Sequence, residues 1–64
     1  MSYDWDVKEN ICVNPRIQNA IAIHLNQDGD VVIRERGEML DDDETVLILK
    51  ENLIAVIERL QQFL

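Results

Sequence analysis

The sequence predicts an α+β fold in which a small antiparallel β-sheet is packed by one C-terminal α-helix. Two observations carry this prediction: residues 20–36 alternate between apolar and other side chains on either side of an Asp-Gly pair, and residues 51–64 repeat their apolar side chains at helical spacing. The chain has 64 residues, enough for one small domain. We therefore expect a single domain over 1–64, with 1–10 as a flexible or extended arm.

The N-terminal residues predict extended chain. Tyr3, Trp5 and Val7 alternate with charged residues, which is the pattern of a short strand or of an extended arm whose aromatic rings pack on the domain. Residues 11–13 predict a second short extended piece. Asn14-Pro15 follows it and predicts a turn.

The hairpin is predicted from residues 20–25 and 31–36. Ile21, Ile23 and Leu25 share one face at a period of two, and the second segment alternates in the same way. Asp28-Gly29 lies between them and favours a two-residue type I′ turn, because both residues tolerate positive φ. One face is apolar and the other mixed, as in an antiparallel sheet covered on one side.

A third strand is predicted over residues 45–50 and a helix over 51–64. The strand is continuously hydrophobic, which indicates burial on both faces, at the centre of the sheet or in an interface. The helix carries its apolar side chains within one stripe: Leu53, Val56, Ile57, Leu60, Phe63 and Leu64. Ile54 lies outside the stripe, so the apolar surface is wider than one sheet covers. This surplus predicts a homodimer or a tight heteromeric contact.

The composition excludes several classes of protein. Six Lys and Arg against thirteen Asp and Glu give a net charge of −7, which argues against direct binding of nucleic acid. No apolar run reaches the length of a membrane span, and the polar start is unlike a signal peptide. Cys12 is the only cysteine, so no internal disulfide forms and a reducing, cytoplasmic location is expected.

The residues that support catalysis or metal binding are scarce. His24 is the only histidine, and Ser2, Thr45 and Cys12 are the only hydroxyl or thiol nucleophiles of their kinds. Nothing in their spacing indicates a catalytic pair, so we expect no catalytic residue and no enzyme. Residues around Gly29 approach the twelve-residue calcium-loop pattern, but His24 occupies the first ligand position, where a carboxylate is required. We therefore expect neither a metal nor a cofactor.

Five carboxylates gather in seven residues between the predicted second and third strands: Glu38, Asp41, Asp42, Asp43 and Glu44. The acidic loop that they form is most simply a solvated loop that keeps a small protein soluble. It is also a candidate surface for a basic protein partner, and carboxylates at this density are a weaker candidate for a cation site.

The combination of a hairpin, an acidic loop and the strand-then-helix segment VLILKENLIAVIERL resembles accessory proteins of phages and mobile elements. Some proteins of that kind inhibit host nucleases or defence complexes by offering an acidic surface to a site that binds nucleic acid. The resemblance implies that Asp41, Asp42, Asp43 and Glu44 are the contact residues in this chain.

The sequence thus predicts a non-enzymatic, homodimeric interaction module that binds another protein. Its candidate apolar contacts are two N-terminal aromatic residues, Tyr3 and Trp5, and two helix residues, Ile54 and Phe63. The aromatic residues have a second interpretation, in which they cover the end of a small core. The alternative function is an acidic inhibitor, or nucleic-acid mimic, that blocks a basic site on a host protein.

Overall fold

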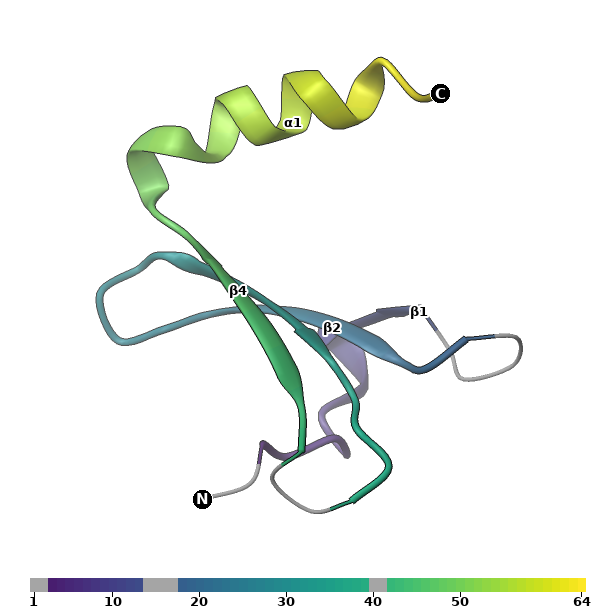
Figure 1. Ribbon diagram of the computed structural model, residues 1–64. Helices are drawn as coiled ribbons and strands as arrows, with labels where there is room; N and C mark the ends of the chain where they lie inside the picture. Colours follow the sequence, from purple (N-terminus) through teal and green to yellow (C-terminus); the bar gives the residue numbers. More distant parts are fainter. Residues whose placement is uncertain (1–2, 14–17, 40–41) are drawn as a thin grey trace.

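The computed structural model describes residues 3–13, 18–39 and 42–64, and it confirms the α+β fold class (Figure 1). Four antiparallel strands form one sheet in the order β1-β2-β3-β4. The strands are β1 (Ile11–Val13), β2 (Ile21–Leu25), β3 (Val31–Glu35) and β4 (Glu44–Ile48). Short 3-10 turns, η1 (Lys8–Asn10) and η2 (Lys50–Asn52), precede β1 and the single helix α1 (Leu53–Gln61). The turn predicted at Asn14-Pro15 lies outside the described residues.

The hairpin of β2 and β3 has the predicted strands but a longer turn. Asn26 N donates to Asp30 O at 2.9 Å, so three residues connect the strands, instead of the two expected for a type I′ turn. Gly29 has a φ of 83°, the left-handed conformation that glycine adopts without strain. The Asn26 side chain fixes this turn, because its Oδ1 accepts from the backbone N–H groups of Asp28 and Asp30, each at 2.9 Å.

The register of the strands gives the sheet two chemically different faces. Cross-strand partners share a face, and Ile23 pairs with Ile33, which pairs with Val46. We call this side the open face; its strand residues are Ile21, Ile23, Leu25, Val31, Ile33, Glu35, Glu44, Val46 and Ile48. The other side we call the docked face; its residues on β2, β3 and β4 are Ala22, His24, Val32, Arg34, Thr45 and Leu47.

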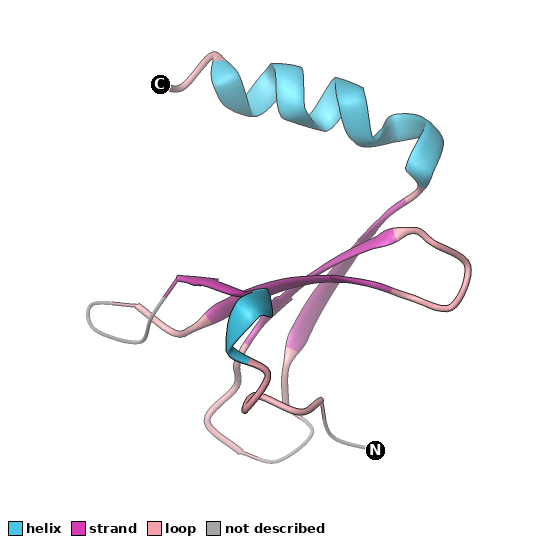
Figure 2. Ribbon diagram, turned by 180° about the vertical axis from the view of Figure 1, so that it is seen from behind, coloured by secondary structure: helices cyan, strands magenta, loops and turns pink. Residues whose placement is uncertain are grey.

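The two ends of the described chain lie on opposite sides of the sheet (Figures 1 and 2). The N-terminal segment, residues 3–10, lies against the docked face, where the Tyr3 ring stacks on His24 at 4.6 Å between centroids. It is an arm that ends in η1 and contains no strand, which settles the two possibilities left by the alternation. Helix α1 follows β4 and lies on the side of the open face.

The core of this protein is small. Among the described residues, the buried hydrophobic side chains are Ala20, Ala22, Val31 and Ile48. The helix contributes little to burial, since Leu53 and Val56 are half-buried and its other residues are exposed. Most of the apolar stripe of the helix therefore faces solvent.

The accessible surface is large for the size of the chain. A compact protein of 7.5 kDa exposes roughly 4,250 Å², whereas this chain exposes 5567 Å², about 1,300 Å² more. The radius of gyration, 12.5 Å, also exceeds the value of about 11 Å expected for a compact 64-residue domain. The accessible surface and the radius of gyration both indicate that this chain leaves exposed some surface that a compact domain of its size would bury.

Strand β4 lies at an edge of the sheet, so its burial differs from the expectation for a central strand. Val46 is 59% exposed and Leu47 is 55% exposed, although they point to opposite faces. Only Ile48 of this strand is buried. Of the two explanations for its continuous hydrophobicity, a position at the centre of the sheet is wrong, and an interface stays a prediction.

None of the helices within residues 3–13, 18–39 and 42–64 is long and apolar enough to cross a membrane.

The Asn26 side chain is the part of the hairpin turn whose loss should be easiest to measure. Asn26→Ala removes two hydrogen bonds to the turn, and we expect the free energy of unfolding to fall by about 1 kcal/mol in urea denaturation. Gln27→Ala, at the exposed neighbouring position, is the control and should unfold like the wild type. Equal unfolding curves for the two variants would show that the turn holds without the asparagine.

Candidate functional site

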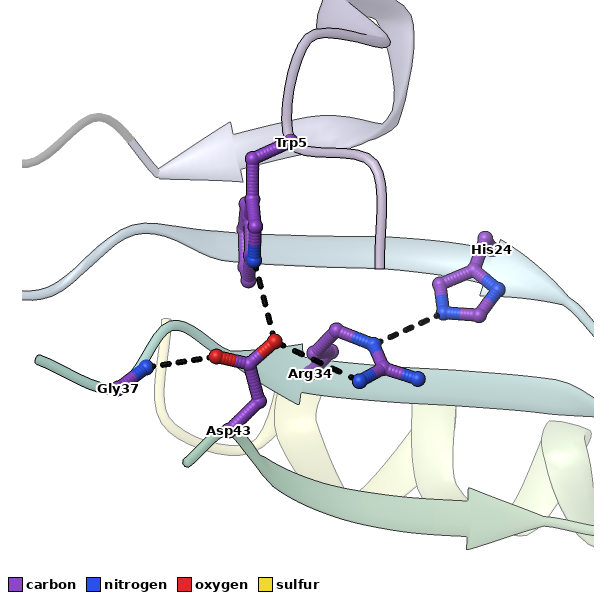
Figure 3. A network of polar contacts seen from close by, with 5 residues as sticks. All are labelled: Trp5, His24, Arg34, Gly37 and Asp43. Atoms are coloured by element: carbon purple, nitrogen blue, oxygen red, sulfur yellow. Dashed lines mark hydrogen bonds and ion pairs between the residues drawn. The ribbon is translucent and has the colours of Figure 1, made fainter. Parts of the chain in front are cut away.

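Asp43 is the centre of a polar network that joins three parts of the chain (Figure 3). Its Oδ1 accepts from the Gly37 N–H at 2.8 Å, and its Oδ2 accepts from the Trp5 indole N–H at 3.1 Å. Arg34 also approaches Oδ2 through Nη1 at 3.5 Å, as an ion pair. One carboxylate therefore fastens the N-terminal segment, the end of β3 and the start of β4.

The environment of Asp43 lowers the pKa of its carboxyl group below the ordinary value of 3.8. Burial of the carboxyl group would by itself raise the pKa, because it disfavours the charged form. The hydrogen bonds from Gly37, Trp5 and Arg34, together with the charge of Arg34, stabilise the carboxylate and outweigh burial. Asp43 is thus ionised at neutral pH and its bonds to the three donors are charge-assisted.

Aromatic and cationic side chains continue this network across the docked face. The Tyr3 ring meets the Trp5 ring edge-on, with centroids 5.1 Å apart. Arg34 lies 4.8 Å from the Tyr3 centroid and Arg36 lies 5.5 Å from the Trp5 centroid, both within the range of cation–π attraction. Of the two interpretations of Tyr3 and Trp5, this packing supports cover of the sheet, since both residues are half-buried against their own chain.

His24 and Cys12 have separate partners. Arg34 Nε donates to His24 Nε2 at 3.4 Å, and His24 Nδ1 lies 3.3 Å from the Leu25 carbonyl oxygen, which fits a neutral ring protonated at Nδ1. Cys12 is exposed, and its Sγ lies 3.5 Å from the carbonyl oxygen of Ile21. The imidazole acts here as a platform for Tyr3 and an acceptor for Arg34.

The structure divides the acidic loop into inward and outward members. Asp43 points into the network, whereas Glu38, Asp42 and Glu44 are exposed; Asp41 lies outside the described residues. Gly37 allows the loop to close: a Cβ at this position would lie 2.6 Å from the Asp42 carbonyl carbon. Within residues 3–13, 18–39 and 42–64, no three His, Cys, Asp or Glu side chains come together as a metal site would require.

The remaining candidate surface is apolar and lies on the other side of the sheet. Ile54 on α1 and Phe63, two residues beyond its end, are each 71% exposed, and Leu60 on α1 is 57% exposed. On the open face, the exposed hydrophobic side chains are Ile23, Leu25 and Val46. We call these six residues, with Ile57 and Leu64, the apolar surface. It comprises exposed side chains of both layers that a single α+β domain would pack against each other.

Sequence reasoning missed the residues that hold the docked face together. Arg34 pairs with Asp43 and stacks on Tyr3, and Arg36 stacks on Trp5; neither arginine was among the candidate residues of the sequence. The available signal was the period-two alternation that places Arg34 and Arg36 on the same face as His24.

Comparisons with known proteins returned no match, whether the chain was compared with family models, with curated proteins or with solved structures. The function is therefore argued from the geometry of the two candidate surfaces.

Asp43→Asn should destabilise the protein at neutral pH by about 1–3 kcal/mol, because an amide replaces the carboxylate that accepts from charged and polar donors. Urea denaturation, monitored by the fluorescence of Trp5, measures the change in the free energy of unfolding. Trp5 is the only tryptophan and is part of this network. Asp42→Asn removes one negative charge from an exposed neighbour and is the control. A loss of stability shared by both variants would assign the effect to net charge.

Acid should remove the contribution of Asp43. Because its pKa is lowered by folding, the stabilisation is present above the ordinary value of 3.8 and is lost as the pH falls through the lowered value. We therefore expect the difference in unfolding free energy between the wild type and Asp43→Asn to be constant near neutral pH and to shrink in acid. Urea denaturation at a series of pH values measures it, and a difference that survives strong acid would contradict the ionised network.

Proposed function

We propose that this protein is a non-enzymatic interaction module that works as a homodimer and binds a further protein through its remaining surface. One observation carries the proposal: the chain exposes about 1,300 Å² more than a compact protein of its mass. A standard protein–protein interface buries about 800 Å² on each partner, so the excess is large enough for one.

The kind of residue exposed supports the same proposal. Single exposed hydrophobic residues are ordinary on protein surfaces, whereas a connected set marks an interaction site. The apolar surface includes three residues of α1, two that follow it and three of the open face. Two of them, Ile54 and Phe63, were candidate contacts from the sequence. Burial of a single Leu or Ile side chain contributes about 1.5–3 kcal/mol, so several together would support stable association.

The acidic inhibitor, or nucleic-acid mimic, is the alternative proposal. It is supported by the exposure of Glu38, Asp42 and Glu44 and by the net charge of −7. Asp43 contributes less to it, since its carboxylate already accepts from three donors of its own chain. Binding to a basic partner through such a loop would weaken steeply with salt, whereas apolar association would not.

The dimer is tested by mass and by one helix substitution. Light scattering over a range of protein concentrations should give twice the mass of the chain. Leu60→Asp should leave the circular dichroism spectrum unchanged, because Leu60 is exposed, but should weaken association roughly tenfold or more, because it places a charge in the apolar surface.

Ala55→Asp introduces the same charge at an exposed position on the opposite side of α1 and should leave the mass unchanged. A wild-type chain that stays monomeric at every concentration would overturn the homodimer. Equal effects of the two substitutions would show that charge, rather than the apolar surface, controls association.

A further inference from the structure

Within residues 3–13, 18–39 and 42–64, no strand pairs with the outer edge of β4, which carries exposed apolar side chains. In the β2–β3 ladder, Asn26 N donates to Asp30 O and Arg36 N to Ala20 O. In an antiparallel sheet, the residues of a central strand turn their backbone groups alternately to one neighbour and to the other. The backbone N–H and C=O groups of the even-numbered residues in and next to β3 therefore bond to β2, and those of the odd-numbered residues bond to β4.

This alternation fixes what β4 presents at the edge. Glu35, Ile33 and Val31 bond to Glu44, Val46 and Ile48, so Thr45 and Leu47 direct their N–H and C=O groups away from the sheet. The strand has no proline and no charged residue between Glu44 and Lys50. An apolar edge without proline is a template for pairing with another strand.

We propose that the partner at this edge is β4 of a second copy of this chain, paired antiparallel about a two-fold axis at Leu47. The two sheets then form one continuous sheet of eight strands. This inference rests on the proposed function, since it specifies how the homodimer forms.

The charges at the two ends of the edge favour this register. With Leu47 opposite Leu47 of the second copy, Val46 faces Ile48, Thr45 faces Leu49 and Glu44 faces Lys50. Apolar residues therefore meet at the centre of the edge and opposite charges meet at its ends. A register centred on Val46 would instead place the Glu44 carboxylate opposite Ile48, which is apolar and buried. Pairing ends at Lys50 because η2 begins there.

A like-charged pair within the chain supports the same arrangement. Glu35 and Glu44 lie directly opposite each other on the open face, which is unfavourable for two carboxylates. Lys50 is exposed and begins η2, two residues after β4 ends at Ile48. In the Leu47 register, Lys50 of the second copy adjoins Glu44 and supplies the missing positive charge.

The symmetry also brings the helices together. Antiparallel pairing of two identical strands requires a two-fold axis perpendicular to the sheet, so both open faces lie on one side and both helices lie on that side. Helix α1 follows β4 almost directly and therefore begins beside the junction. The exposed side chains of the two helices and of the joined open face then form one apolar layer, which accounts for the uncovered area.

Disulfide trapping tests the register. In a Cys12→Ser background, Leu47→Cys should form an interchain disulfide on mild oxidation and double the mass on a non-reducing gel, because directly opposite residues have Cα atoms about 5.5 Å apart. Thr45→Cys is the matched control on the same face of the same strand. Its copies would be four residues out of register, about 13 Å apart, and should not be trapped.

A charge exchange tests the register without cysteine. Glu44→Lys and Lys50→Glu should each weaken the dimer roughly tenfold, because two attractive pairs become repulsive. Mixing the two single variants should restore association, since each chain then faces its opposite charge at both ends of the edge. The double variant should also recover the wild-type affinity.

The outcomes separate this inference from the proposed function. A wild-type dimer that shows no trapping at Leu47 and no recovery in the mixture would overturn pairing through β4 and leave the homodimer intact. A wild-type chain that is monomeric throughout would overturn both. Trapping at Thr45 in place of Leu47 would overturn the register.

Discussion

The carboxylate of Asp43 is the contact on which the closed side of this molecule depends. It accepts from the N-terminal segment, from the end of β3 and, through Arg34, from the strand beside it, so it joins parts of the chain that are up to 38 residues apart in sequence. A sheet with four buried hydrophobic side chains among its described residues has little other means of holding an arm in place. The aromatic rings and arginines then complete the docked face, because each ring lies against a guanidinium or an imidazole of the sheet.

The opposite side of the sheet has no comparable cover. Most of the apolar stripe of α1 faces solvent. Small domains usually compensate for a limited core with disulfides, metals or association. A chain with one cysteine has no internal disulfide, so the exposed area itself makes association the natural source of additional stability. The docked face depends on polar contacts within the chain. The open face is proposed to depend on contacts with a second copy of the chain.

Periodicity predicted the elements well, since alternation placed β2 and β3 within one residue of their bounds and helical spacing found α1. It could not predict which face of the sheet the helix would leave uncovered, because a stripe of apolar side chains is the same whether it packs on its own chain or on another. It likewise described residues 45–50 as doubly buried, since a hydrophobic run does not distinguish a central strand from an edge strand in an interface. The role of Asp43 within the acidic loop was invisible for a different reason: Trp5 and Gly37 reach it from distant parts of the sequence, and no local pattern distinguishes it from Asp42.

Strand β1 has a consequence for the size of the assembly. It is three residues long, and its pairing with β2 slips between Ile11 and Val13. Short strands and irregular registers are the means by which natural sheets keep an edge from recruiting further strands. If two chains join through β4, both outer edges of the combined sheet are β1, so growth stops at a pair and a fibril cannot extend from either end.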